Sequence, residues 1–506
     1  MKKIFKNKKI LFLVLALILI LILSLSFFSG CFKKDFISKF SKNVSSYNID
    51  VNINEKEKTL LVKQTTKFYN SKKVSLKDVH FHIYPKAFSE GVINKPVSSL
   101  NEQKAYTSGV NYGSVEITNV KLANKTLSPR YLNVDKDILV VDLEKELKPN
   151  NSTNIYFEYT LKLPNINHRY GYGDNTINLG NFYLIASVYD EKTGWADNSY
   201  NYNGDPFYSE IANYYVSVEY SSNFVLAHTG NEESKTTTGD RNKLKIKALA
   251  VRDFALILSD KYKVLKEKYN GINVNYFYYN DKTPEKSLKT SVDSLKTFIK
   301  LFGEYPYKNL NVCESNFVYG GMEYPNLVFI ADNLDNYEDY THTIVHEIAH
   351  QWWYSLVGNN EFKYGFLDES LTEYSTYLFY DENPSYNMDT REMIKNTTNS
   401  YLLFLDVYKE VFTKVDTSML RSLDEFKTEP EYIYMAYVKG TLMYDNLKEI
   451  IGTQKFIKSL KYYYKQNRGK NVVPTDLINA FNKVTKKNLD SYFNSWLNGT
   501  VVIESI

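Results

Sequence analysis

The residues with the clearest chemical meaning lie between His346 and Glu369. This stretch opens with His-Glu-Ile-Ala-His, so His346 and His350 stand four residues apart and Glu347 directly follows the first histidine. On a helix of about 3.6 residues per turn, residues i and i+4 project from one face, where two imidazoles can bind a single ion beside the glutamate. The spacing therefore indicates a hydrolytic zinc site.

A hydrolytic zinc ion takes three protein ligands and keeps one position open for water, so the motif needs a third ligand. Glu369 is the first candidate because it begins a run with helical periodicity. Two antiparallel helices joined by the loop 358–365 would place it opposite the histidine pair. Glu373, one turn further along that helix, is the second candidate.

Three neighbouring polar residues have open roles. His342 stands four residues before His346, but a pair of these two histidines would lack the glutamate that follows the first ligand. We therefore expect His342 to be a polar neighbour of the site. Asp368 and Glu373 either orient a ligand histidine through its second ring nitrogen or are solvated helix residues.

Four motifs along the chain resemble those of the gluzincin aminopeptidase family, typified by aminopeptidase N and leukotriene hydrolase. In chain order they are Gly320-Gly321-Met322-Glu323-Tyr324, which is similar to Gly-Ala-Met-Glu-Asn; the zinc motif with eighteen residues before Glu369; Gln351-Trp352-Trp353 after the second histidine; and Tyr437-Val438-Lys439-Gly440, which is similar to Tyr-x-Lys-Gly. The segments 204–210 and 251–255 also resemble the family's N-terminal domain. Thermolysin-like enzymes have a ligand spacing one residue longer, so the count favours the aminopeptidase type.

The resemblance implies one zinc ion per chain, held by His346, His350 and Glu369. It assigns to Glu347 the removal of a proton from the attacking water. It assigns to Tyr437 a hydrogen bond to the oxyanion that forms during peptide hydrolysis. From spacing alone, a core aromatic residue of a helix is the more ordinary interpretation of Tyr437.

The resemblance also implies how a peptide substrate binds. Glu323 would recognise the free α-ammonium, so that amino acids are released singly from the N-terminus. Gly320, Gly321 and Met322 belong to the same substrate-binding motif. Tyr324 replaces the family's asparagine, and no counterpart is evident for the glutamine by which the N-terminal domain helps to hold the substrate's amine.

Three functions are open at this point: a membrane-anchored zinc aminopeptidase, an endopeptidase on the same scaffold, and a non-catalytic surface binding protein. A binding protein needs neither a general base nor an oxyanion donor, so Glu347 and Tyr437 argue against the third. The chain also stops where the family's catalytic domain stops, and we expect an open cleft that admits longer peptides.

The elements that must position these residues fall into two parts, which predicts an α+β fold. Between residues 47 and 263 apolar residues alternate with polar ones, as at Ile155, Phe157 and Tyr159, so we predict an N-terminal β-sheet-rich domain. Helical periodicity dominates in residues 264–506, which predicts a mostly α-helical catalytic domain. The resemblance implies that this domain is thermolysin-like.

One predicted strand carries His80 and His82, with Asp78 on the same face. Such side chains could form a second metal site. The opposite face carries Val79 and Phe81, so outward-facing polar residues are the favoured interpretation of the histidines.

Residues 1–31 predict a membrane-targeting segment. Five of the first nine residues are lysines, an uncharged run follows from Ile10 to Phe28, and Ser29-Gly30-Cys31 ends it. Small residues before a cysteine resemble a bacterial lipoprotein signal, in which Cys31 is lipidated. The alternative is an uncleaved signal anchor, because Phe28 replaces the usual leucine. In both cases we expect a polar tether over 32–46 and a catalytic domain on the extracytoplasmic side of the cell membrane.

The 506 residues carry a net charge of only +4, and five lysines lie in the leader. The sequence therefore predicts peptide and membrane partners and no nucleic-acid-binding surface. The chain has two cysteines, Cys31 and Cys313, so a lipidated Cys31 would leave no disulfide within the chain. Cys313 stands in an alternating stretch and is predicted to be a buried strand residue.

Overall fold

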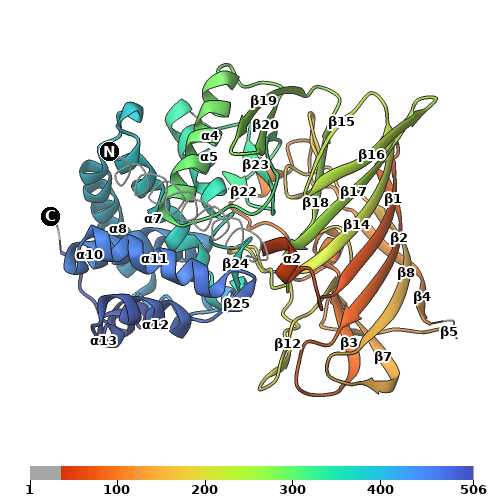
Figure 1. Cartoon of the computed structure of the whole chain (residues 1–506), viewed down its shortest axis with the longest axis horizontal. Helices are drawn as coiled ribbons and strands as arrows, with labels where there is room; N and C mark the ends of the chain where they lie inside the picture. The colour runs from red at the N-terminus through yellow and green to blue at the C-terminus, as the bar shows by residue number, and fades with distance from the viewer. Residues whose placement is uncertain (1–35, 124, 335, 505–506) are drawn as a thin grey trace, which may run out of the picture.

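The structure is a computed structural model that describes residues 36–123, 125–334 and 336–504. A part built from β-sheets comes first in the chain, and a second part combines a smaller sheet with helices (Figure 1). The predicted fold class, α+β with a sheet-rich domain before a mostly helical one, is confirmed.

The largest sheet of the first part has eight strands. In β1, Tyr47, Ile49, Val51 and Ile53 are buried and the residues between them are exposed, which is the pattern of a strand packed on one side. In spatial order the strands are β16 (Asn231–Thr238), β17 (Arg241–Val251), β14 (Ala212–Ser221), β1 (Ser46–Asn54), β2 (Thr59–Tyr69), β8 (Ser152–Lys162), β4 (Ser114–Leu122) and β5 (Lys125–Thr126).

The first part also contains smaller sheets and three short helices. One four-stranded sheet has the order β15 (Val225–His228), β18 (Ala255–Ser259), β10 (Ile177–Gly180) and β9 (Tyr170–Tyr172). Another has the order β11 (Ile185–Ala186), β3 (Leu76–His82), β7 (Ile138–Leu147) and β6 (Arg130–Leu132). The remaining short elements are β12 (Tyr189–Asp190), β13 (Gly194–Trp195), α2 (Phe36–Phe40), η1 (Tyr84–Phe88) and α3 (Glu102–Ala105).

Strand β3 differs from its prediction, because His80 and His82 are buried rather than outward-facing. His80 Nδ1 lies 2.7 Å from Asp197 Oδ2, and Ser187 Oγ lies 3.0 Å from His82 Nδ1. The chain segment that carries Ser187 and Asp197 covers the face that the alternation alone would leave exposed. Both imidazoles are therefore polar groups of the interior.

A five-stranded sheet opens the second part, and its edge strand lies next to the candidate site. In spatial order its strands are β19 (Lys263–Tyr269), β20 (Ile272–Tyr278), β21 (Asn309–Ser315), β23 (Leu327–Ala331) and β22 (Gly321–Met322). Gly321 of β22 pairs with Ile330 of β23 in an antiparallel register. Cys313 lies in β21, where it is free and fully buried, as predicted.

Helices form most of the rest of the second part (Figure 1). They are α4 (Pro284–Leu301), α5 (Tyr337–Ala349), α6 (Glu361–Tyr364), α7 (Phe366–Glu382), η2 (Pro384–Tyr386), α8 (Thr390–Phe412), η3 (Leu423–Glu425), α9 (Glu429–Ile433), η4 (Tyr434–Val438), α10 (Lys439–Ile451), α11 (Thr453–Asn467), α12 (Pro474–Thr485) and α13 (Asp490–Leu497). Between α5 and α6, β24 (Val357–Asn359) pairs in parallel with β25 (Lys470–Val472). This pairing fixes the connection between the two helices that carry the predicted zinc ligands.

The tether predicted over 32–46 also differs from the structure. Phe36 is 1% exposed and begins the short helix α2. Its ring lies 4.7 Å from the Phe40 ring and 6.1 Å from the Tyr307 ring, measured between centroids. Phe36 and Phe40 thus fix residues 36–40 to the second part of the molecule, because their burial removes apolar area from water.

A buried arginine joins the two parts close to the site. The Arg252 guanidinium donates from Nη1 to the Ser209 carbonyl at 2.6 Å, from Nε to the Tyr354 carbonyl at 2.9 Å, and from Nη2 to the Lys470 carbonyl at 3.1 Å. A Cβ atom at Gly358 would lie 2.0 Å from Arg252 Cζ, so only glycine fits there. Arg252 thereby fixes the connection between α5 and α7 against the sheet part.

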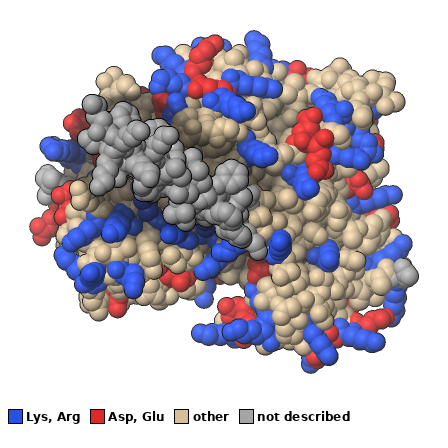
Figure 2. All heavy atoms as spheres, viewed as in Figure 1, with Lys and Arg blue, Asp and Glu red and all other residues tan. Residues whose placement is uncertain are grey.

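The leader and Cys31 lie outside the described residues. Within the part of the chain that the structure describes, no helix combines the length and the apolar character that crossing a bilayer requires. On the face shown in Figure 2, basic and acidic side chains are interspersed.

Candidate active site

The two histidines of the zinc motif lie at the end of α5. Asn336 caps the start of this helix, where its side chain accepts a hydrogen bond from the Asp339 N–H at 2.9 Å, and His350 is the C-terminal cap. Both imidazoles are buried, and their Nε2 atoms lie 3.2 Å apart. The i, i+4 spacing therefore directs the two rings to one point.

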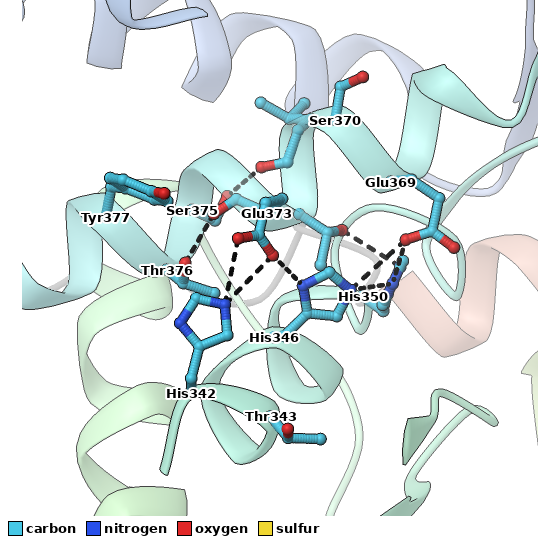
Figure 3. Close-up of polar contacts among 12 residues, drawn as sticks. His342, Thr343, His346, His350, Glu369, Ser370, Glu373, Ser375, Thr376 and Tyr377 are labelled. Carbon is cyan, nitrogen blue, oxygen red and sulfur yellow. Dashed lines mark hydrogen bonds and ion pairs between the residues drawn. The ribbon is translucent and has the colours of Figure 1, made fainter. Parts of the chain in front are cut away.

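Glu369 lies in the first turn of α7 and faces the histidine pair (Figure 3). Its Oε2 is 3.4 Å from His346 Nε2 and 3.3 Å from His350 Nε2, and this buried oxygen receives no hydrogen bond. A tetrahedral zinc ion about 2.0–2.1 Å from each ligand separates the ligand atoms by about 3.3 Å. The three atoms fit such an ion, so His346, His350 and Glu369 could hold it.

Glu373, the second candidate ligand, faces the outer side of the histidines. Its Oε2 lies 2.9 Å from His346 Nδ1, and His342 Nε2 lies 3.1 Å from its Oε1 (Figure 3). A carboxylate on the second ring nitrogen fixes the tautomer of a ligand histidine and makes its Nε2 more basic. Glu373 is therefore placed to orient His346, and His342 contacts Glu373 rather than forming a pair with His346.

His350 is oriented by two groups that the sequence did not single out. Its Nδ1 lies 2.9 Å from the Trp353 carbonyl and 3.1 Å from Thr372 Oγ1. A backbone carbonyl has no side-chain signal, and a threonine within a helix is not distinctive. Asp368, the other residue considered for this role, instead accepts a hydrogen bond from Asn359 Nδ2 at 3.0 Å.

Glu347 lies between the histidine pair and the edge strand β22. A Cβ atom at Gly321 would lie 2.4 Å from Glu347 Oε1, so the strand can approach the carboxylate this closely only because Gly321 has no side chain. Glu347 Oε2 is buried and receives no hydrogen bond. Burial raises the pKa of Glu347 to about 7, a value that suits a group that accepts and then releases a proton near neutral pH.

Tyr437 lies on η4, a π-helical turn inserted between α9 and α10. Its ring is roughly parallel to the His346 ring, with 5.9 Å between centroids and an interplanar angle of 14°. Burial raises the pKa of Tyr437 well above its ordinary value, so the hydroxyl stays a hydrogen-bond donor. A Cβ atom at Gly440 would lie 2.0 Å from Ser370 Oγ, so this glycine lets α10 approach the helix that carries Glu369.

Glu323 directly follows β22 and points toward the metal donors. It is 3% exposed, its Oε1 receives no hydrogen bond, and one of its oxygens lies within 4.8 Å of ligand-capable atoms of Glu347 and His350. Burial raises its pKa well above the ordinary range. Met322 is buried beside it, and Gly320 lines the cleft.

Tyr324, which stands where the family has asparagine, is fully buried. Its hydroxyl donates to Asn181 Oδ1 at 2.7 Å, and a Cβ atom at Gly180 would lie 1.8 Å from the Tyr324 hydroxyl oxygen. The tyrosine thus occupies a slot at the end of β10 and joins the motif to the sheet part.

A cleft of about 310 Å³ opens over these residues. Its lining includes residues of the second part, namely Gly320, Gly321, His342, Thr343, His346, Glu347, Glu373, Glu429, Tyr432 and Tyr437. From the first part it includes Arg169 and Asp205, which form a buried ion pair. Asp205 was not predicted as a site residue. It lies in the segment 204–210, and the resemblance of this segment to the family's N-terminal domain is the sequence feature that could have indicated its role.

A sheet-rich domain is joined to a helical domain, and two histidines at the end of α5 meet a glutamate of α7 around one point. This arrangement is typical of the gluzincin class of metallopeptidase folds. Residues 287–496 match the family model described as Peptidase family M1 domain. This match agrees with the resemblance to the gluzincin aminopeptidase family that the sequence motifs carry.

Individual relatives agree with this assignment. Aminopeptidase 2 of Candida albicans is 21% identical over 78% of this chain and 44% of its own length. Aminopeptidase B of Rattus norvegicus is 28% identical over 46% of this chain and 35% of its own length. The chain therefore spans less than half the length of these curated relatives.

Solved structures show the same fold over nearly the whole chain. The crystal structure of an M1 zinc metallopeptidase from Deinococcus radiodurans has a TM-score of 0.65 at 15% identity, and the match covers 92% of this chain and 96% of that one. A mutant of the Deinococcus protein was crystallised with a Tyr-Ser-Ala substrate, at a TM-score of 0.64 to the present chain.

Proposed function

We propose that this chain is a zinc aminopeptidase that releases N-terminal amino acids from peptides. The observation that carries the proposal is the convergence of His346 Nε2, His350 Nε2 and Glu369 Oε2 within 3.2–3.4 Å of one another. The buried Glu347 and the partly buried Tyr437 line the same cleft. Ligands, a proton acceptor and an oxyanion donor in one place support hydrolysis rather than binding alone.

The residues that would hold zinc are His346, His350 and Glu369, and the bound ion would polarise the scissile carbonyl and lower the pKa of water. Glu347 lies beside this donor set without joining it. Its carboxylate takes a proton from the attacking water and delivers it to the nitrogen of the leaving amine. Glu373, through His346 Nδ1, keeps that imidazole oriented with Nε2 toward the donor set.

Tyr437 supplies the donor for the charge that develops on the carbonyl oxygen. Its hydroxyl remains protonated because desolvation raises its pKa well above the ordinary value, and its ring is held against the His346 ring. A preorganised donor of this kind is worth roughly 10²–10³ in rate. The ring therefore has a role that a purely structural core aromatic would not have.

Recognition of a free N-terminus is assigned to Glu323. Its unpartnered Oε1 is buried next to Glu347 and His350, where an α-ammonium can make a charge-assisted hydrogen bond. The Tyr-Ser-Ala substrate bound by the Deinococcus neighbour supports peptides as the substrate class. An endopeptidase on the same scaffold is the second candidate, because the cleft reaches the surface.

We expect a peptide with a free N-terminus to be cleaved one residue at a time and its N-acetylated twin to be cleaved hardly at all. A charge-assisted contact contributes ~1.5–3 kcal/mol, so acetylation should lower kcat/KM by roughly ten- to more than a hundredfold. Glu323→Ala should lower kcat/KM by a similar factor on the free peptide and change little on the acetylated one. Product analysis by mass spectrometry over time measures both.

Cleavage of both peptides at internal bonds with comparable kcat/KM would reject the aminopeptidase and favour the endopeptidase. Tight binding of peptides with no turnover, in protein that contains zinc, would favour the surface binding protein.

We also propose that the chain is exported and held at the cell membrane through Cys31, with its catalytic domain outside. The lysine-rich start, the apolar run and the small residues before Cys31 support this. Because Phe36 is packed against the body, the link from Cys31 is short, and five residues span at most ~18 Å. The body would then lie close to the bilayer.

Intact-mass measurement of the membrane-extracted protein tests the anchor. We expect a mature chain that starts at Cys31 and carries lipid, and we expect Cys31→Ala to accumulate as an unprocessed precursor. A wild-type chain that still starts near Met1 would instead identify an uncleaved signal anchor.

A further inference from the structure

The outer face of α11 carries a row of lysines. The exposed lysines of this helix, called the lysine row below, are Lys455, Lys458, Lys461 and Lys465. Because an α-helix turns by ~100° per residue, these four positions fall within an arc of about 120°. The buried residues face the opposite way, and they are Phe456, Ser459, Leu460, Tyr463, Tyr464 and Asn467. Figures 1 and 2 show α11 on the near side of the molecule, with basic side chains along it.

No acidic residue balances the lysine row. Helix α11 contains no aspartate or glutamate between Thr453 and Asn467, and among the described residues no ion pair joins any of the four lysines to a carboxylate. Lys448 of α10 shows the contrast, because its Nζ lies 3.4 Å from Asp381 Oδ2 and 3.7 Å from Asp445 Oδ1. A helix face that only meets water usually carries both signs of charge, whereas a basic amphipathic helix is typical of contact with an anionic surface.

The C-terminal end of α11 contacts the helix α2. Arg468 comes directly after α11, and its guanidinium carbon lies 5.8 Å from the centroid of the Phe36 ring. A Cβ atom at Gly469 would lie 2.5 Å from Phe40 Cδ1, so α2 packs closely on the turn that ends α11. Arg468 is not part of the lysine row, since its Nη1 lies 3.1 Å from Glu304 Oε2. Helix α2 and one end of the lysine row thus lie side by side.

The lysine row lies close to the predicted anchor along the chain. Cys31 stands five positions before Phe36, so the chain between them spans at most ~18 Å. Lys465 stands three positions before Arg468, which is less than one helical turn, and from Lys465 the row extends ~15 Å along the helix axis to Lys455. A bilayer that holds Cys31 is therefore within reach of the row, at the high effective concentration that a short link gives.

We propose that the lysine row of α11 docks on the anionic headgroups of the bilayer that anchors the chain. This inference rests on the proposed anchor at Cys31, and it adds the surface that meets the lipid and thereby the orientation of the body. A lysine beside an anionic membrane surface strengthens binding by roughly fivefold, and four lysines on one face act together. A soluble polyanion would meet the same charges, but only the bilayer is brought to them by the anchor.

Rates of lysine acetylation, measured by mass spectrometry on the full chain in lipid vesicles, test the docking. We expect the lysine row to react roughly tenfold more slowly on vesicles that contain phosphatidylglycerol than on vesicles of phosphatidylcholine alone. Salt at ~1 M shortens the Debye length to ~3 Å, so it should restore the faster rate. Three exposed lysines of the eight-stranded sheet, Lys63, Lys235 and Lys245, should react equally on both kinds of vesicle. Equal rates for the lysine row on both vesicles, or protection that persists at ~1 M salt, would overturn the proposal.

A variant with three changes tests whether the lysines act together. Its substitutions are Lys455→Gln, Lys458→Gln and Lys465→Gln. The remaining Lys461 should lose most of its protection on phosphatidylglycerol vesicles, because three of the four charges on its face are gone. The matched control combines Lys63→Gln, Lys235→Gln and Lys245→Gln, which removes the same charge from the large sheet and should leave Lys461 protected. All six side chains are exposed, so both variants should hydrolyse a soluble peptide as the wild type does. Protection of Lys461 that survives in the first variant, or is lost in the control, would contradict the docking.

Two further measurements separate the docking from the anchor and from other partners. Flotation of the full chain with phosphatidylcholine vesicles tests the anchor by itself, because these lipids carry no net charge. A chain that does not float with them would reject the anchor, yet protection of the lysine row on phosphatidylglycerol vesicles would still support the docking surface. Added polyphosphate, at an equal concentration of anionic charge, should not protect the row on phosphatidylcholine vesicles. Equal protection by polyphosphate would overturn the bilayer in favour of a soluble polyanion.

Discussion

Replacing Glu347 with glutamine is expected to abolish most of the hydrolysis while leaving about one zinc ion per chain. The amide keeps the size of the carboxylate next to Gly321 but cannot accept a proton from water, so kcat/KM should fall by roughly 10²–10⁴. Metal content is retained because none of the three converging donor atoms is altered. Steady-state kinetics and elemental analysis of the same preparation measure both quantities.

Glu338→Gln is the matched control for this change, because Glu338 is exposed in the first turn of the same helix. It should retain wild-type kcat/KM and zinc. Loss of zinc from Glu347→Gln would mean that this carboxylate belongs to the metal ligands, and the assignment of its neighbours would have to be revised.

Removal of the Glu369 side chain should eliminate both zinc and activity. In Glu369→Ala the pair of imidazoles loses the carboxylate oxygen that lies 3.3–3.4 Å from their Nε2 atoms, and two histidines alone do not complete a catalytic zinc site. Glu373→Gln should behave differently, because Glu373 acts on the opposite ring nitrogen of His346. A partner of this kind typically changes metal affinity by 10–100-fold, so zinc should still bind at high metal concentration.

A calorimetric titration of each apo variant with zinc compares their zinc affinities directly. Full zinc occupancy in Glu369→Ala, with complete loss of zinc in Glu373→Gln, would reverse the two assignments: Glu373 would be the zinc ligand and Glu369 the orienting residue. This is the same choice that the spacing of the sequence left open.

The parts of the fold that the sequence predicts well are those whose pattern is local. Ile49, Val51 and Ile53 alternate because one face of β1 packs on the interior. The same alternation predicts exposed side chains at His80 and His82, and this prediction is wrong. The face they occupy is covered by the residues around Ser187 and Asp197, more than 100 positions away. Burial by a distant segment leaves no trace in the alternation of a strand.

The site shows the same division. The relation between His346 and His350 is a property of one helix turn, and the count of residues to Glu369 carries the family resemblance. The partners of His350 are a backbone carbonyl and Thr372, and neither residue type indicates such a role.

Tyr437 lies on the π-helical turn η4, so the direction of its side chain depends on the number of residues in this turn as well as on the residue type at position 437. The run from Glu429 to Ile451 passes from α9 through η4 into α10, and in a regular α-helix each residue advances the direction of the side chain by ~100°. A π turn holds one additional residue within its hydrogen-bonded ring. Loss of any one residue from Tyr434 to Ala436 would allow a continuous α-helix and would rotate the Tyr437 ring away from His346 by about one such step. Natural variation in this segment should therefore tolerate changes of side chain more readily than insertions or deletions.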